Sequence, residues 1–543
     1  MVSNTSQRLA RLRALVVDDM PAMRQNIHTQ LGQIGIGHVD QAGTPDEAVS
    51  FIRRSGYDLV LCDYNLNRET NGQQLLEFLR TQGLITPATM FIMITAESSY
   101  DMVAAAVEFQ PDAYMIKPLT GGKLLERIER LLDKQNALRP IADRLKLKDA
   151  AGAVAECDRT MAAQPKWALD ILKIKGAALL ELGDPEQAET AYRQALAMRA
   201  DLLWARMGVA RCHQAAGRLA EAREAAQQVL EQDARHVPAY DLLAALAEAQ
   251  GEQREALDIL SRSYEVVPSA RRSRLVGDSA YRAGDLALAR SAFERTLNHT
   301  RGSLTAQPAD LLSLAQVQID GGEADAALKL LAAAPKHYAE SERFVAARHA
   351  VQAQAHVKLG DRAAAAQAFE AARAASAELR ADDSALALAK AAFSLGRDDE
   401  GADILARAVK ADHENRRMVA LARKVLRDSG KEALAPAVVD RALDEVTAIL
   451  SEANAQMRNA QFDASLATLE RALAVMPENT AVLLAAAQLH LLWMSQKGLN
   501  RDYVAKVNGY LARLDALMPG SERVAKMYRF LRETLSRAGK GQP

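Results

Sequence analysis

The chain has 543 residues and a mass of 59.0 kDa, a length that predicts several domains rather than one. The 68 Lys and Arg nearly balance the 69 Asp and Glu, so the net charge of −1 favours neither nucleic acid nor an anionic membrane as partner. Three cysteines without a CxxC pair disfavour a disulfide framework or zinc site and predict a reducing, cytoplasmic location. No apolar stretch is long enough to predict a membrane span or a secretion signal.

Short apolar runs alternate with helical patterns over the first 139 residues. Continuous apolar runs are typical of strands buried on both faces of a parallel sheet. Between them, Thr44 to Glu47 reads as a helix start, with an N-cap, a proline and two acids. The pattern predicts an α/β doubly wound domain with five helices and a five-stranded parallel sheet. The expected strands are 15–17, 59–61, 91–94 and 113–116, with a weaker candidate at 38–41.

A helical repeat replaces this pattern after about residue 140. Turn glycines recur every 33 to 38 residues, with a small residue seven positions before each and another five positions after it. Small residues allow two helices to pack closely, and each pair buries its remaining apolar face on the next pair. We therefore expect an all-α helical-repeat solenoid. The glycines are Gly183, Gly217, Gly251, Gly284, Gly322, Gly360 and Gly396.

The spacing of these glycines resembles the tetratricopeptide repeat, a helix–turn–helix unit of 34 residues. The resemblance covers most of 141–518, including a half-repeat at 150–165 and weaker copies at 453–477 and 482–518. The last segment, 521–543, carries an apolar stripe typical of a capping helix. That stripe consists of Val524, Met527, Phe530, Leu531 and Leu535.

Charged and polar residues follow the expected strands of the first domain. Asp18 and Asp19 follow the first strand, Asp63 the third, Thr95 the fourth and Lys117 the fifth. Because the carboxyl ends of parallel strands meet at one edge, we expect these side chains to converge. Three clustered carboxylates need a cation, and an all-oxygen site suits Mg²⁺. With a lysine and a threonine beside them, they predict phosphoryl transfer to a carboxylate nucleophile, for which Asp63, alone at its strand end, is the natural candidate.

This constellation resembles the receiver domain of two-component response regulators. The resemblance implies a sheet of strand order 2-1-3-4-5. It also implies that Asp63 accepts a phosphoryl group from a histidine kinase, and that Thr95 and Lys117 meet the phosphoryl oxygens. The implied Mg²⁺ ligands are Asp18, Asp19, Asp63 and the backbone carbonyl of Asn65.

The resemblance extends to two further features and fails at one. Tyr114 occupies the position of the switch aromatic, whose ring moves inward when Thr95 is drawn to the phosphate, and the Lys117–Pro118 bond is expected to be cis. The segment 64–72, however, lacks the family's proline and places its glycine nine residues after Asp63 rather than eight. The loop beside the phosphorylation site is therefore one residue longer than usual.

The combined organisation predicts a phosphorylation-controlled adaptor. We expect a receiver domain at 1–139, tetratricopeptide-like repeats at 140–520 and a capping helix and tail at 521–543. The expected partners are a sensor histidine kinase or phosphotransfer protein and an unknown protein in the repeat groove. The chain shows no motif of a separate output enzyme and none for DNA binding.

An alternative function is a phosphorelay intermediate or phosphate sink whose repeats only dock the donor. Asn65 and Glu97 occupy the positions that tune self-dephosphorylation in the family, and their side-chain types resemble those of fast-hydrolysing members. In either case the last receiver helix, 119–138, is expected to enter the repeats with only Arg139–Pro140 as a break. A junction this short favours mechanical coupling.

Overall fold

The structure is a computed structural model that describes residues 4–66, 70–86, 89–96, 110–147, 149–376, 383–518 and 521–539. The chain divides into two compact units, residues 1–310 and residues 311–543. The first unit contains an N-terminal α/β domain and the first helical repeats, and the second unit contains the remaining helices.

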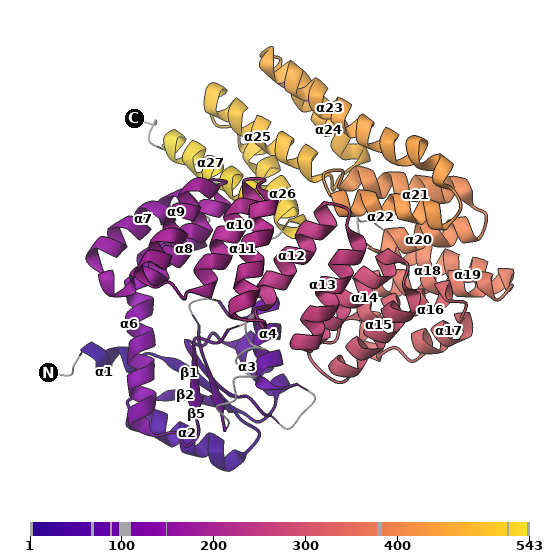
Figure 1. Ribbon diagram of the computed structural model, residues 1–543. Helices are drawn as coiled ribbons and strands as arrows, with labels where there is room; N and C mark the ends of the chain where they lie inside the picture. The colour runs from indigo at the N-terminus through magenta and orange to yellow at the C-terminus, as the bar shows by residue number, and fades with distance from the viewer. Residues whose placement is uncertain are drawn as a thin grey trace. The chain divides into compact units, whose positions relative to one another are not determined.

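A parallel sheet forms the centre of the α/β domain (Figure 1). Its order in the described residues is β2-β1-β3-β4-β5, which confirms the predicted topology. The weaker candidate near residue 38 is a strand at the sheet edge, paired in parallel with β1. The strands are β1 Arg13–Val17, β2 His38–Ala42, β3 Leu59–Asp63, β4 Met90–Thr95 and β5 Ala113–Ile116.

Alternate residues of the central strands face two separate apolar layers. Leu15 and Val60 pack with residues of α3 and α4, whereas Val16 and Leu61 pack with residues of α2 and α6. The helix expected between β4 and β5 falls on 97–109, outside the described residues. The described helices are α1 Asn4–Leu9, α2 Pro21–Gln33, α3 Pro45–Arg54, α4 Gly72–Thr81 and α6 Gly121–Lys146.

Helix α6 corrects the expected break at Arg139–Pro140, because it runs through Pro140 to Lys146. A proline inside a helix removes one backbone hydrogen bond and costs about 3 kcal/mol. Apolar packing on both sides of Pro140 outweighs this cost. Leu132 is buried against the sheet, and Ile141 is buried beside Cys157 of the first repeat helix. The predicted domain boundary at 139/140 falls inside this helix and stays a prediction.

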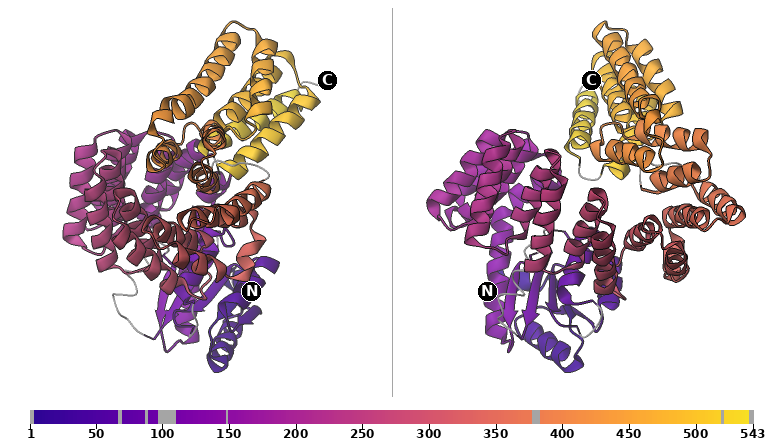
Figure 2. Two further views of the ribbon diagram at one scale, coloured as in Figure 1. Left: turned by 90° about the vertical axis from the view of Figure 1, so that its right-hand side faces the viewer. Right: turned by 45° about the vertical axis from the view of Figure 1, so that its right-hand side comes forward.

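The repeat helices of the first unit follow α6 along the chain and stack side by side (Figure 2). The predicted half-repeat is α7, and the carboxyl-terminal half of α6 supplies its partner helix. The elements are α7 Ala150–Ala163, η1 Pro165–Trp167, α8 Ala168–Glu181, α9 Pro185–Met198, α10 Leu203–Ala215, α11 Leu219–Gln232, α12 Val237–Ala249, α13 Gln253–Val266, α14 Ala270–Ala283 and α15 Leu286–Thr300.

All seven predicted turn glycines adopt left-handed backbone, with φ between 75° and 85°. This conformation costs a residue with a Cβ atom free energy, so glycine is favoured at each turn. Two later turns were not recognised from the sequence: Gly430 has φ 68° and Ala460 has φ 59°. Ala460 joins two helices of the second unit, so the repeat pattern continues there without its glycine signal.

Aromatic rings fill the space that the small residues leave between helices. A Cβ atom at Gly176 or at Gly208 would lie 2.5 Å from the ring of Tyr192. In a later repeat, a Cβ atom at Gly277 would lie 2.9 Å from the ring of Phe293. These glycines therefore leave the space that the aromatic rings occupy.

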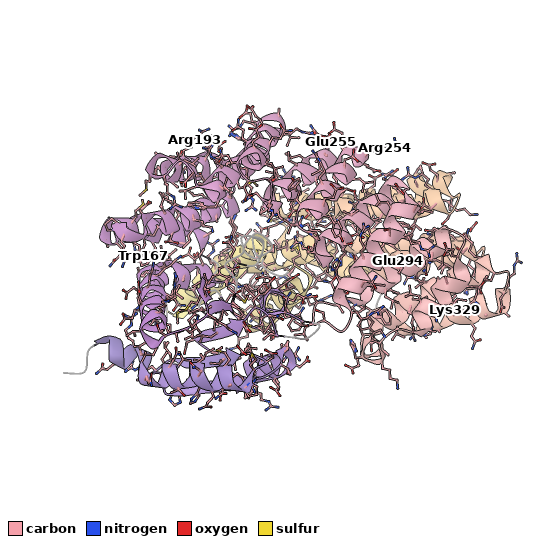
Figure 3. All side chains as sticks on the ribbon, turned by 60° about the horizontal axis from the view of Figure 1, so that its bottom comes forward. Trp167, Arg193, Arg254, Glu255, Glu294 and Lys329 are labelled. Carbon is pink, nitrogen blue, oxygen red and sulfur yellow. The ribbon has the colours of Figure 1, made fainter. Side chains whose placement is uncertain are left out.

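The second helices of the repeat pairs carry a charged outer surface. Figure 3 shows Arg193 of α9 and Arg254 of α13 at the outer margin of these helices, and both are exposed. Glu189 of α9 and Arg218, which precedes α11, form an ion pair of 2.7 Å. Ion pairs of fully exposed side chains contribute at most about 1 kcal/mol each, so exposed charges such as Arg193 and Arg254 add little to the stability of the stack.

The second unit is helical throughout its described residues. Val524 and Leu531 of α27 are buried as the capping stripe predicts, whereas Leu535 is 38% exposed. Among the described residues, no helix has the length and apolar character that a membrane span requires. The elements from α16 onward are α16 Pro308–Asp320, α17 Ala324–Ala332, η2 Lys336–Glu340, α18 Glu342–Lys358, α19 Arg362–Ala375, α20 Asp383–Ser394, α21 Asp398–Ala411, α22 Arg416–Asp428, η3 Glu432–Leu434, the π-helical turn η4 Pro436–Asp440, α23 Arg441–Arg458, α24 Phe462–Val475, α25 Thr480–Lys497, α26 Arg501–Leu517 and α27 Glu522–Gly539.

Two glycine-to-alanine variants test whether close helix packing determines these positions. Gly208→Ala places a methyl group against the Tyr192 ring, so we expect a loss of about 1–3 kcal/mol of stability from overpacking. Gly509→Ala is the matched control, because that exposed helical site has nothing within 4 Å. The control should gain about 0.5–1 kcal/mol from helix propensity. Thermal unfolding measures both, and equal changes of the same sign would contradict the packing account.

Candidate functional site

The carboxyl edge of the sheet brings the predicted site residues together. Asp63 ends β3, Asp18 directly follows β1 and Lys117 directly follows β5. The Lys117 ammonium lies 2.9 Å from a carboxylate oxygen of Asp63 and 3.2 Å from one of Asp18. Two carboxylates and one lysine, separated by up to 99 positions in the chain, therefore form a single charge cluster.

Three acidic side chains converge at this edge. One carboxylate oxygen each of Asp18, Asp19 and Asp63 lies within 4.8 Å of the others. Asp18 is fully buried, Asp63 is 7% exposed and Asp19 is half-buried. The backbone N–H of Met20 donates to Asp18 at 2.9 Å, which fixes the orientation of that carboxylate.

Burial and charge act in opposite directions on the paired groups. Burial raises the pKa of the Asp63 carboxyl, and the opposing effect of the Lys117 charge does not cancel it. For Lys117, burial acts to lower the pKa of the ammonium, but the Asp63 and Asp18 carboxylates outweigh it and leave that pKa raised. Burial therefore has a larger effect on the pKa of Asp63 than the attraction of Lys117 has.

This donor set fits Mg²⁺. The cation prefers oxygen ligands, binds through one or two carboxylates and retains waters that a phosphate oxygen can replace. Asp18, Asp19 and Asp63 supply carboxylate oxygens only, at the partly open edge of the sheet. Asn65 lies exposed two residues beyond Asp63, and its role as a carbonyl ligand stays a prediction.

The two predicted switch residues flank the cluster on β4 and β5. Thr95 is buried at the end of β4, and its carbonyl accepts the N–H of Lys117 at 2.8 Å. Tyr114 is half-buried on β5, and burial raises its pKa to about 12. Its hydroxyl makes no hydrogen bond with the described residues. Glu97, the predicted tuning residue, lies outside the described residues.

Two features at this edge bear on the resemblance described from the sequence. The Lys117–Pro118 peptide bond is cis, as the resemblance predicts. Gly72, the displaced glycine, lies against the phosphoacceptor candidate, since a Cβ atom there would fall 2.2 Å from the carbonyl oxygen of Asp63. The requirement for glycine therefore comes from close backbone approach, a reason that spacing alone does not show.

Sequence reasoning missed Arg24 as part of this site. Its guanidinium, on α2, donates to the carbonyl oxygen of Asp18 and so supports the acidic strand end. The backbone around Asp63 is fixed in a similar way, because the N–H of Tyr64 donates to the carbonyl of Ile94 at 2.8 Å. Neither contact has a signature in the sequence, because each is accepted by a backbone carbonyl, a group that every residue carries.

Comparison with known proteins agrees with this geometry. Residues 14–129 match the family model of the response regulator receiver domain. The first domain is a response regulator receiver domain. Tetratricopeptide repeat models match residues 179–247 and 351–415, so the receiver domain precedes a tetratricopeptide repeat region.

Among the similar proteins, two chemotaxis proteins match over about the length of the receiver domain, and a repeat protein matches over a third of the chain. The chemotaxis protein CheY of Pseudomonas aeruginosa is 27% identical over 125 residues, which are 23% of this chain and 99% of that protein. The solved structure of Vibrio cholerae chemotaxis protein CheY4 is 24% identical with a TM-score of 0.21, and the match covers 22% of this chain and 97% of that one. The repeat protein TTC0263 of Thermus thermophilus is 17% identical with a TM-score of 0.27, over 33% of this chain and 98% of that one.

The acidic cluster predicts that Mg²⁺ stabilises the folded receiver domain. A cation that binds only the folded state raises its stability, by about 2.7 kcal/mol at one hundred times the dissociation constant. We expect Mg²⁺ to raise the unfolding temperature of the wild type and to have much less effect on Asp19→Asn. Asp133→Asn, at an exposed acid outside the cluster, is the matched control. A full Mg²⁺ response in Asp19→Asn, measured against EDTA, would contradict the site.

Proposed function

We propose that this protein is a response regulator in which phosphorylation of Asp63 controls the protein–protein interactions of a tetratricopeptide repeat adaptor. The observation that carries the proposal is the cluster in which Lys117 contacts both Asp63 and Asp18 at the open edge of a receiver domain. The chemical class of the phosphodonor is a phosphohistidine, on a sensor histidine kinase or a phosphotransfer protein. No separate catalytic domain is among the family models that match the chain.

The proposed chemistry is transfer of a phosphoryl group to a carboxylate. A carboxylate oxygen of Asp63 forms a bond to phosphorus as the phosphorus–nitrogen bond of the donor breaks. The electron pair of that bond returns to the imidazole nitrogen, which takes up a proton from solvent. Lys117 holds a positive charge beside the new acyl phosphate, and a bound Mg²⁺ would supply further neutralisation of the phosphoryl oxygens.

Thr95 and Tyr114 are the proposed reporters of phosphorylation inside the receiver domain. Thr95 lies at the end of β4, next to the carboxyl end of β3 that carries Asp63. A phosphoryl group on Asp63 offers three acceptor oxygens, so the Thr95 hydroxyl has a new partner to donate to. The hydroxyl of Tyr114 on the neighbouring strand is buried and makes no hydrogen bond with the described residues, so moving that ring breaks no hydrogen bond to them.

Helix α6 is the proposed route by which phosphorylation affects the repeats. Its first half is buried against the receiver sheet through Leu124 and Ile128, and its second half is buried against α7 through Ile141. Because a continuous helix transmits displacement better than a flexible linker, a shift of the receiver end would move the first repeat. A change in the angle between repeats would alter the surface offered to a protein partner.

Phosphorylation with a small phosphodonor tests the proposal directly. Wild-type protein incubated with Mg²⁺ and acetyl phosphate should gain a single phosphoryl adduct, measured as intact mass. Asp63→Asn should gain none, and Asp133→Asn should behave as the wild type. An adduct that persists in Asp63→Asn, or none in folded wild-type protein, would contradict the assignment of Asp63.

The lifetime of the adduct separates the proposal from its alternative, a phosphorelay intermediate or phosphate sink whose repeats only dock the donor. A sink requires rapid loss of the phosphoryl group, within seconds. A switch that controls partner binding requires a phosphorylated population that survives long enough for the partner to bind. Capture of partners by the phosphorylated and unphosphorylated chain then shows whether the repeats respond.

A further inference from the structure

Two departures from the expected sequence patterns meet in the first unit. One is the longer segment after Asp63, which ends at Thr70 to Gly72. The other is the linker between α15 and α16, residues 301–307, which has seven residues where the preceding linkers between repeats have three or four. This linker accounts for the wider spacing between Gly284 and Gly322.

The two segments are joined by hydrogen bonds across 233 positions of the chain. The N–H of Leu304 donates to the hydroxyl oxygen of Thr70 at 3.0 Å, and the hydroxyls of Thr70 and Ser303 lie 3.3 Å apart. Thr70 is 3% exposed and Ser303 is 7% exposed. Such burial makes the contact costly to break unless other partners replace it.

Apolar contact reinforces these bonds. Leu304 packs against the receiver's apolar layer on the α3 and α4 side, the layer that also contacts Tyr64 and Tyr114. Leu304 and Phe78 of α4 line a cavity of about 320 Å³ together with side chains of α3. Because this cavity is open to solvent and partly lined by charged side chains, Leu304 lies at the edge of the apolar layer and not inside a dense core.

Charged side chains extend this interface toward α14. Arg274 of α14 forms a two-pronged ion pair with Asp310, with contacts of 2.5 Å and 2.8 Å, and Asp310 is buried. Glu77 of α4 adds to the electrostatic field that favours the charged form of Arg274. The outer side of α4 therefore faces the repeats. Thr70, which precedes the helix, lies on this side together with Glu77 and Phe78.

The opposite side of the amino-terminal end of α4 contacts the backbone of Asp63, the proposed phosphoacceptor. The N–H of Gly72 donates to the carbonyl of Tyr64 at 2.8 Å, and the Gly72 Cα approaches the Asp63 carbonyl closely enough to exclude a side chain. Asn71 and Gln74 close a capping box that fixes this end of the helix. Only Asn71 thus separates the backbone that contacts Asp63 from the hydroxyl that binds Leu304.

We propose that α4 and the linker 301–307 form an intramolecular switch contact, through which the repeats of the first unit sense phosphorylation of Asp63. The proposal rests on the proposed function. A phosphoryl group adds a charge of about −1.5 to −2, and the amino-terminal end of a helix attracts anions. Phosphorylation shifts the Gly72 end of α4, which already contacts the Asp63 backbone, and withdraws the Thr70 hydroxyl from Leu304. The linker is then released from the receiver domain.

Hydrogen exchange of the full chain tests this contact at the peptide that contains residues 302–306. In the unphosphorylated wild type, the Leu304 N–H should be protected by Thr70. Phosphorylation with Mg²⁺ and acetyl phosphate should speed exchange there about five-fold, the change expected for loss of one hydrogen bond. Thr70→Val removes the acceptor and keeps the side-chain shape, so it should give the same increase without phosphate.

Thr190→Val is the matched control, because the Thr190 hydroxyl is exposed and bonds only within its own helix. It should leave exchange of the linker and its response to phosphorylation unchanged. In Thr70→Val, phosphorylation should add no further increase at 302–306.

The outcomes separate this inference from the proposed function. An intact-mass adduct on Asp63 with unchanged exchange at 302–306 would overturn the switch contact and leave the receiver assignment standing. If changes were confined to residues 141–200, coupling would run through α6 alone, and the inference would again fail. Absence of an adduct in folded protein would overturn the proposed function and this inference with it.

Discussion

Helix α6 belongs to two hydrophobic cores at once, and the organisation of the first unit depends on this sharing. Leu124, Ile128 and Leu132 close one face of the receiver sheet, while Ile141 lies in the core of the first repeat helices. Neither core can lose its part of α6 without exposing apolar surface. The receiver domain and the first repeats are therefore joined by packing rather than by a flexible tether, which gives phosphorylation a mechanical route into the solenoid.

A second connection makes the first unit a closed loop. The chain leaves the receiver through α6, passes through the helices α7 to α15 and returns at Leu304 to the receiver's α3 and α4 side. Each repeat contacts its neighbours, so constraints at both ends of this stretch restrict its curvature. Release of one end would let the curvature change while α6 keeps the other end attached. In the proposed function, the receiver domain would thereby act on a partner surface some distance from Asp63.

The features that the sequence predicted are those with a local or periodic cause. Apolar runs mark the buried strands, and the residues after each strand end identify the acidic cluster, because strand ends converge in a parallel sheet. The turn glycines mark the helix pairs because left-handed backbone favours glycine. The roles assigned to Asp63, Thr95 and Asn65 stay predictions, since geometry shows proximity but not reaction.

The features that the sequence did not predict come from long-range packing. Pro140 signalled a break, but burial of Ile141 and Leu132 on either side holds the helix together. The Thr70–Leu304 contact joins segments that no periodicity links. Its traces in the sequence were irregularities: one extra residue after Asp63 and a 38-residue spacing between Gly284 and Gly322. Only the three-dimensional structure shows that these irregularities meet.

The central claim is that phosphorylation of Asp63 changes the geometry between the receiver domain and the repeats of the first unit. The distance between spin labels on Thr29→Cys in α2 and Arg254→Cys in α13 measures this most directly, because both sites are exposed and the native cysteines are buried. The account predicts that Mg²⁺ with acetyl phosphate shifts the distance distribution, and that the shift disappears in Asp63→Asn. A phosphorylated protein with an unchanged distribution would contradict it.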